Sequence, residues 1–205
     1  MKDETPGSID LTMAADVLSS NFNKGGGKSP FLNAGVYKDG YAFTIKVDAV
    51  KSSNRLVLGD VLQPSNEVPM EYWIDSDRLP EWEYLKGAKT LERTHKSGVA
   101  YRYAEGKMAF PDLLSNPSRT ILTGEGGTSP SRFKHIIQVD GKHSRLTPIE
   151  LERLNGFPDD WTKTATEGSQ VSDVRRSFFM GNALVIGLVE RVGNELAKAI
   201  SSASR

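Results

Sequence analysis

The stretch RLTPIELERLNGFPDDW, Arg145 to Trp161, carries a nearly complete set of helix-boundary signals around a helix of barely two turns. Thr147 occupies the N-cap position, Pro148 the first helical position, and Glu150 completes a capping box three residues after the cap. Gly156 supplies a left-handed stop. The sequence therefore predicts a short helix between Thr147 and Gly156, with both of its ends fixed.

Apolar residues flank these caps. Leu146 before the cap and Leu151 after it form a candidate hydrophobic staple, and Leu151 and Leu154 share one face of the helix. Each capping device stabilises a helix by only about 0.5 to 2 kcal/mol, yet together they fix the ends of a helix too short to be stable alone. An ordinary surface helix would show the same signals, so the function of this element depends on its surroundings.

The whole chain has the composition of a globular protein, with 205 residues, 38% hydrophobic and 25% charged. This length suits one large domain or two small ones. No apolar run approaches the roughly 18 to 20 residues of a membrane helix, and the start MKDETPGSIDL lacks the order of a signal peptide, so we expect a soluble, cytoplasmic protein. The absence of cysteine excludes disulfides, thiolate metal sites and thiol nucleophiles.

Charge is unevenly distributed although the net charge is zero. Residues 1–85 carry 8 basic and 13 acidic groups, residues 86–145 carry 11 and 5, and residues 146–205 carry 7 and 8. A basic middle between acidic or neutral flanks is typical of a protein that contacts a polyanion, because phosphate neutralisation dominates nucleic-acid affinity. A solvated basic face is an equally good interpretation of charge alone.

The first third contains a glycine-rich loop and a hairpin signal. GGGKS at 25–29 is similar to the end of a phosphate-binding P-loop, but Phe22 stands where that motif needs glycine, so we expect an ordinary loop. VYKDGYAFTIKV at 36–47 reads as two short strands around the turn Asp39-Gly40. Core packing is the expected role of the aromatic residues that follow, which are Tyr72, Trp73, Trp82 and Tyr84.

The basic middle alternates short apolar runs with Gly, Ser, Pro and Asn, which predicts a loop-rich, mostly β region. Its loop GEGGTSPSRFKH, at 124–135, combines glycines and hydroxyls with arginine, lysine and histidine. Glycines let a backbone approach a ligand closely, hydroxyls and amides bind phosphates, and Arg or Lys can read guanine edges. By itself, however, this composition is weak evidence, because most loops rich in glycine and serine only connect structural elements.

An amphipathic helix of about four turns is expected near the end of the chain, where apolar residues recur every four positions: Leu184, Leu188, Val192, Leu196 and Ile200. Gly181, Asn182 and Ala183 stand just before or at its start. A helix N-terminus with a small residue and an amide is suited to receive a ligand carboxylate, although asparagine caps are common.

The segments RLTPIELERLNGFPDDW and FFMGNALVIGLVERVGNEL, in this order and spacing, closely resemble motifs IX and X of the DNA (cytosine-5) methyltransferases. RTILTGEGGTSPSRFKHII looks like the target-recognition region that precedes them, and the resemblance covers roughly residues 86–200. It implies an α+β chain with a flexible or partner-contacting leader at 1–34 and a loop-rich β target-recognition domain at 35–145. Residues 146–205 then supply the short capped helix and an amphipathic helix that completes an α/β methyltransferase domain.

The resemblance also implies the chemistry of the complete enzyme. In this family a large, S-adenosylmethionine-dependent domain and a small recognition domain enclose the DNA, and the target cytosine is flipped out of the stack. A cysteine in a Pro-Cys motif attacks that base, and a glutamate in a Glu-Asn-Val motif assists. Motif IX braces the recognition domain, and motif X completes the cofactor pocket.

This sequence contains neither Pro-Cys nor Glu-Asn-Val, and it lacks the Phe-Xaa-Gly-Xaa-Gly and Gln-Xaa-Arg-Xaa-Arg elements. We therefore expect no catalytic residue and no metal site in this chain, and no methylation by the chain alone. It is either the recognition subunit of a split enzyme, as in restriction–modification, or the carboxy-terminal piece of a longer protein. Met1 with its polar leader favours the split form. The alternative is a non-catalytic DNA-binding or regulatory module derived from such an enzyme.

We expect double-stranded DNA to be contacted by the following loop residues: Gly124, Glu125, Gly126, Gly127, Thr128, Ser129, Ser131, Arg132 and Lys134. Glu125 and Arg132 are best able to read bases, since glutamate accepts from cytosine and arginine donates to guanine. Lys134 is expected to contact phosphate. Arg119 is a more doubtful candidate, because it can pair with a carboxylate instead.

The other roles follow from the motif resemblance. Asn182 and Ala183 are expected to line an S-adenosylmethionine pocket shared with the catalytic chain. The residues expected to brace the structure are Arg145, Thr147 and Glu150. The apolar face at 184–200 is expected either to contact a catalytic chain or to drive self-association.

Overall fold

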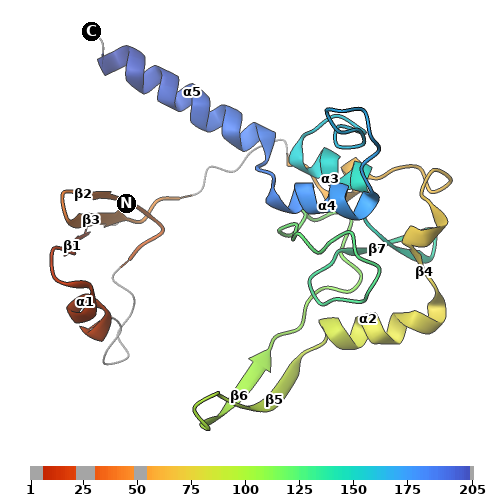
Figure 1. Cartoon of the computed structure of the whole chain (residues 1–205), viewed down its shortest axis with the longest axis horizontal. Helices are drawn as coiled ribbons and strands as arrows, with labels where there is room; N and C mark the ends of the chain where they lie inside the picture. Colours follow the sequence, from red (N-terminus) through yellow and green to blue (C-terminus); the bar gives the residue numbers. More distant parts are fainter. Residues whose placement is uncertain (1–6, 22–30, 49–54, 204–205) are drawn as a thin grey trace. The chain divides into compact units, whose positions relative to one another are not determined.

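The computed structural model describes residues 7–21, 31–48 and 55–203 (Figure 1). The chain divides into two compact units, Met1–Ser53 and Asn54–Arg205. The hairpin expected around Asp39 therefore folds with the first unit, although the sequence placed the start of the recognition domain at residue 35. The functional assignment of these segments stays a prediction, and GGGKS lies outside the described residues.

The described residues of the first unit form a three-stranded antiparallel sheet and one helix. Its elements are β1 (Gly7–Asp10), α1 (Ala15–Asn21), β2 (Ala34–Lys38) and β3 (Tyr41–Ile45), with β3 in the centre of the sheet. Asp39 and Gly40 have φ angles of 51° and 84° and join β2 to β3. Two successive positive φ angles are those of a tight hairpin turn, so the predicted hairpin is confirmed.

The second unit mixes helices with two small antiparallel sheets. Its ordered elements are η1 (Leu58–Val61), η2 (Met70–Tyr72), β4 (Trp73–Ile74), η3 (Ser76–Arg78), α2 (Leu79–Lys86), β5 (Lys89–Thr94), β6 (Ala100–Glu105), β7 (Ile136–Val139), β8 (Lys142–Arg145), α3 (Pro148–Asn155), α4 (Asp173–Asn182) and α5 (Ile186–Ala203). Strands β4, β8 and β7 form one sheet in that order, and β5 and β6 form a separate hairpin. The stretch between β6 and β7 contains no helix or strand, which agrees with the loop-rich region expected there.

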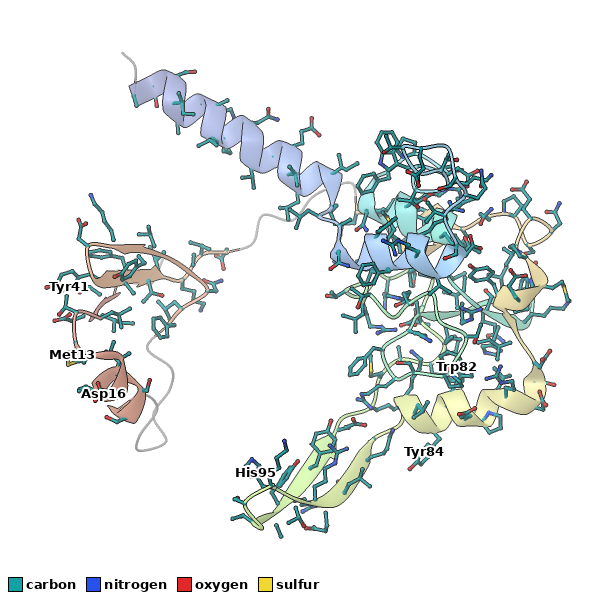
Figure 2. All side chains as sticks on the ribbon, viewed as in Figure 1. Met13, Asp16, Tyr41, Trp82, Tyr84 and His95 are labelled. Carbon is teal, nitrogen blue, oxygen red and sulfur yellow. The ribbon has the colours of Figure 1, made fainter. Side chains whose placement is uncertain are left out.

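The hydrophobic core of this unit is centred on the buried face of α3. It joins η1, β7, α3 and α4 through Leu58, Val61, Ile137, Leu146, Leu151, Leu154 and Met180. Leu146 and Leu151, the predicted staple pair, are both fully buried, which stabilises the fold by roughly 1.5 to 3 kcal/mol for each leucine. The aromatic residues divide: Tyr72 and Trp82 are buried as expected, whereas Tyr84 is 66% exposed (Figure 2).

The predicted boundaries of α3 are confirmed. The hydroxyl Oγ1 of Thr147 accepts a hydrogen bond from the N–H of Glu150 at 3.2 Å, and the N–H of Thr147 donates to Oε2 of Glu150 at 2.8 Å. Gly156 ends the helix with a φ of 82°. The capping box and the left-handed stop therefore fix the helix as the sequence indicates.

The end of the chain forms two helices where the sequence predicts one. Asn182 is the last residue of α4 and Ala183 is its C-cap, so both stand just before α5 as expected, but at the end of an additional helix that the sequence did not predict. Helix α4 escaped detection because its buried residues include the polar Arg176 and Ser177 beside Met180. Helix α5 contains no buried residue. Among the described helices, none has the length and apolar character needed to cross a membrane.

Candidate nucleic-acid interface

The glycine-rich loop at 124–132 packs directly against α4. A Cβ atom added to Gly126 would lie 2.6 Å from Cβ of Ser177 and 3.0 Å from Cα of Val174. A Cβ atom added to Gly181, on α4, would lie 2.5 Å from the backbone nitrogen of Thr123. No real side chain fits at such distances, so two glycines, one on each partner, allow the loop and the helix to touch.

Two buried cations hold the loop from within. Nζ of Lys134 donates to the carbonyl oxygens of Gly127 and Ser129, both at 2.6 Å, and Nη1 of Arg145 donates to the carbonyl of Gly127 at 3.2 Å. Burial lowers the pKa of Lys134 and that of Arg145. Lys134 is only 7% exposed, so in this conformation it braces the loop and is not available for the phosphate contact expected of it.

Glu125 is also turned inward. Its Oε1 accepts a hydrogen bond from the backbone N–H of His135 and lies 3.0 Å from Nδ1 of that residue. Nε2 of His135 lies 3.1 Å from the hydroxyl of Ser118. Glu125 is 2% exposed, and its Oε2 has no partner among the described residues. In this structure the carboxylate of Glu125 is directed at His135 in the interior, and its contact with a base stays a prediction.

Arg132 joins the end of the loop to the base of the β5–β6 hairpin. Its guanidinium donates to the carbonyls of Leu85 and Gly87, at 3.3 Å each, and to Oε2 of Glu105 at 3.1 Å. It also donates to the carbonyl of Gly106. Arg132 therefore serves here as an anchor, and its role as a base reader stays a prediction.

The remaining loop residues form the exposed part of this site. Gly124, Thr128 and Ser129 are exposed, and Ser131 is half-buried with its hydroxyl accepting from the N–H of Phe133 at 3.3 Å. Backbone groups and hydroxyls of this kind bind phosphate oxygens and sugars. The exposed backbone groups and hydroxyls of the loop are thus free to contact a ligand, whereas its charged side chains point inward and stabilise the loop.

A buried ion network lies beneath the loop. Nζ of Lys86 donates to the carbonyl of Lys134 at 2.6 Å and lies 3.9 Å from Oδ2 of Asp112. Asp112 accepts from Nε of Arg119 at 2.8 Å and from the N–H of Ile136 at 2.9 Å. Burial lowers the pKa of Lys86 to about 8. The carboxylate pairing considered for Arg119 is therefore confirmed.

The three residues expected to brace the structure make bracing contacts. Nη2 of Arg145 donates to the carbonyl of Glu71 at 2.7 Å. Oε1 of Glu150 accepts from the N–H of Gln63 at 3.0 Å, and the Thr147 hydroxyl donates to Oε1 of Gln63 at 2.6 Å. Burial raises the pKa of Glu150. The capping box of α3 thus reaches beyond the helix to a segment far away in the sequence.

A second network, not predicted from the sequence, joins α3 to α4. Nη2 of Arg176 lies 3.0 Å from Oε1 of Glu152 and 2.9 Å from Oδ1 of Asp160. Nδ2 of Asn155 donates to the carbonyl of Met180 at 2.9 Å. The available signal was the pair of carboxylates in and after the short helix, followed by an arginine on α4. This network joins α3 to α4 through buried polar contacts.

Comparison with known protein families finds a match over most of the chain. The family model described as C-5 cytosine-specific DNA methylase matches residues 22–198. This chain belongs to the C-5 cytosine-specific DNA methylase family. The predicted family is therefore confirmed, and the match extends further upstream than residue 86, where the resemblance seen in the sequence began.

Two curated members of the methylase family show the same relationship. The chain is 41% identical over 182 residues to the type II methyltransferase M.Sau3AI of Staphylococcus aureus, an alignment that covers 88% of this chain and 40% of that protein. It is 26% identical over 148 residues to the type II methyltransferase M.NlaX of Neisseria lactamica, covering 72% of this chain and 41% of that protein. The chain thus spans about two fifths of the length of these methylases.

The residues expected at the cofactor lie where α4 ends. Asn182 is exposed, and its Nδ2 donates to the carbonyl of Phe178 at 3.0 Å. Ala183 packs at the edge of the hydrophobic core. The role of these two residues at S-adenosylmethionine stays a prediction.

Proposed function

We propose that this chain is the DNA-recognition part of a DNA (cytosine-5) methyltransferase and works with a catalytic region on a separate chain, as in restriction–modification. The observation that carries this proposal is the contact between the loop and α4. Gly126 touches Ser177, and Gly181 touches Thr123, at distances that exclude any larger residue. The loop proposed to contact DNA is therefore in contact with the helix that ends at Asn182, the proposed cofactor residue.

The residues of this chain supply binding and positioning. Backbone groups and hydroxyls of Gly124, Thr128 and Ser129 would contact the DNA backbone, which sets the register of the protein on the duplex. Asn182 and Ala183 would close one side of the pocket for S-adenosylmethionine, which supplies the methyl group. The chain has no cysteine, so the thiol nucleophile used in this family must come from the catalytic region.

Helix α5 would connect this chain to that catalytic region. Leu188, Val192 and Leu196 are 57%, 61% and 59% exposed and lie on one face of the helix. A continuous exposed apolar stripe marks a protein interface. We therefore assign this face to the catalytic chain, with self-association as the other outcome of a binding experiment.

Reconstitution tests this function. The chain would be co-expressed with a candidate partner that carries the Pro-Cys and Glu-Asn-Val motifs, and transfer of labelled methyl groups to DNA would be measured. We expect transfer from the pair and none from either chain alone. The absence of both motifs here supports a second candidate, a non-catalytic DNA-binding module. That candidate predicts sequence-specific DNA binding with no effect on any such partner.

A further inference from the structure

The β5–β6 hairpin extends beyond the end of α2, away from the rest of its unit (Figure 1). Every residue from 90 to 102 is exposed, and among the strands that the structure describes these two pair only with each other. A two-stranded hairpin in water is marginally stable at best and contributes nothing to a core. This one therefore lacks a structural reason to project so far, and its surface chemistry indicates what it does.

The two faces of the hairpin differ. Residues directly opposite each other in the register share a face. On one face, Leu91 is opposite Tyr103 and Arg93 is opposite Tyr101, with the Arg93 guanidinium 3.9 Å from the centre of the Tyr103 ring. The other face, here called the small-residue face, consists of Thr90, Glu92, Thr94, Ala100, Arg102 and Ala104. It is flat apart from Glu92 and Arg102, which lie opposite each other at its centre.

The base of the hairpin is fixed, and its outer part is basic. Glu105, at the base, is paired with Arg132 at 3.1 Å and with Lys89 at 3.5 Å. Because Arg132 ends the glycine-rich loop, loop and hairpin are held together. Beyond this anchor lie three cations against the single acid Glu92, namely Arg93, Lys96 and Arg102.

We propose that the hairpin is a second DNA-contacting element, whose small-residue face enters the major groove of a duplex. The proposal rests on the proposed function of the chain. Arg102 donates to a guanine edge, and Lys96, at the turn, contacts phosphate. A two-stranded ribbon fits a major groove about 12 Å wide, and six residues per strand reach about 20 Å.

The chemistry of the small-residue face matches this groove. Thr90, Thr94 and the two alanines let the backbone approach the bases, and alanine and threonine methyl groups pack against thymine methyl groups. Arginine binds guanine bidentately, and Glu92 beside it accepts from a cytosine amino group. An acidic protein partner would suit the cations, but it would not account for Glu92 beside Arg102 or for the small residues on either side of them.

The test compares the full chain with Arg102→Ala, Lys96→Ala and, as a charge-matched control, Arg191→Ala on the exposed α5. Each protein would select from a pool of short duplexes with a randomised centre, and affinity would be followed against salt. We expect Arg102→Ala to lose preference at one G·C pair by about tenfold or more. Lys96→Ala should weaken binding to all sequences and reduce the salt slope by about one. The control should match the wild type.

The outcomes separate this proposal from the proposed function. If the wild type binds duplexes and both hairpin variants select the same sequences with unchanged affinity and salt slope, the hairpin proposal is overturned and the proposed function stands. If the wild type binds no DNA, with or without a catalytic chain, both are overturned. If the hairpin variants lose binding to a catalytic chain while their DNA binding stays intact, the hairpin proposal is also overturned. Unchanged thermal unfolding of the variants will show that each one is folded.

Discussion

The carboxylate of Glu125 and the imidazole of His135 lie 3.0 Å apart in the interior, and the same carboxylate oxygen accepts the backbone N–H of His135. His135 is fully buried and Glu125 is 2% exposed. This pair closes the glycine-rich loop onto the strand that follows it. Residues that the sequence suggested as DNA readers thus set the shape of the loop.

Replacing Glu125 with alanine should lower the free energy of unfolding by about 1 to 3 kcal/mol, because it leaves buried donors on His135 without an acceptor. Denaturant unfolding measures this loss, with the exposed Glu190→Ala as the control. Since Glu125 braces the loop, affinity should fall to a similar extent for every DNA sequence. A change in base preference without a loss of stability would instead restore Glu125 as a base reader.

The contact between the loop and α4 predicts a contrast between glycines. Gly126→Ala and Gly181→Ala should each destabilise the fold by about 1 to 3 kcal/mol, because the new methyl group meets backbone or a buried side chain. Gly193→Ala is the matched control, because a Cβ there meets nothing within 4 Å. Thermal unfolding should show it neutral or slightly stabilising. Equal tolerance at all three positions would contradict the close packing.

Lys86 predicts a dependence of stability on pH. Burial lowers its pKa in the folded protein to about 8, from 10.5, so between these values the unfolded chain binds more protons than the folded one. The free energy of unfolding contributed by this group therefore rises as the pH increases above about 8. Comparing Lys86→Met with the wild type by denaturant unfolding between pH 7 and 10, roughly the span between these pKa values, isolates the effect. Parallel curves for the two proteins would contradict it.

Helix α5 predicts an interface that mutation can remove without unfolding the rest. Leu188→Glu combined with Val192→Glu places two charges on the exposed apolar face, where no core packing is lost. Binding to a catalytic chain, measured by titration calorimetry, should weaken by at least about tenfold, since each charge must be desolvated at the interface. Glu190→Ala, on the polar side, should bind as the wild type does. Unchanged binding of the double variant would exclude this face.

Local features of the fold were the most predictable from the sequence. The caps of α3 and the turn at Asp39 and Gly40 are determined by neighbouring residues, and α5 by a simple repeat of apolar positions. Helix α4 was not predicted, because its buried face includes the polar Ser177 and Arg176, and Arg176 pairs with the distant carboxylates of Glu152 and Asp160. Hydrophobic periodicity detects helices that bury an apolar face. It does not detect helices whose buried face is polar and paired with residues elsewhere in the fold.

The residue types of the loop predicted that it belongs to the site, but they did not predict whether its charged side chains point outward or inward. Glutamate, arginine and lysine beside glycines suit DNA, and the same groups also suit the backbone carbonyls and the histidine they meet here. Which of these partners each residue finds depends on packing against Lys86, Gly87 and α4, and these lie far away in the sequence. The exposed β5–β6 hairpin was not predicted as a site, because what distinguishes it is its projection from the fold, and the sequence does not show this.

The most direct test of the central claim is a titration of this chain into a fixed amount of a catalytic chain carrying the Pro-Cys and Glu-Asn-Val motifs, with labelled methyl transfer to duplex DNA as the readout. We predict no transfer at zero addition, a rise with added chain, and saturation at equal amounts of the two. A rate independent of this chain, or transfer by this chain alone, would contradict the claim.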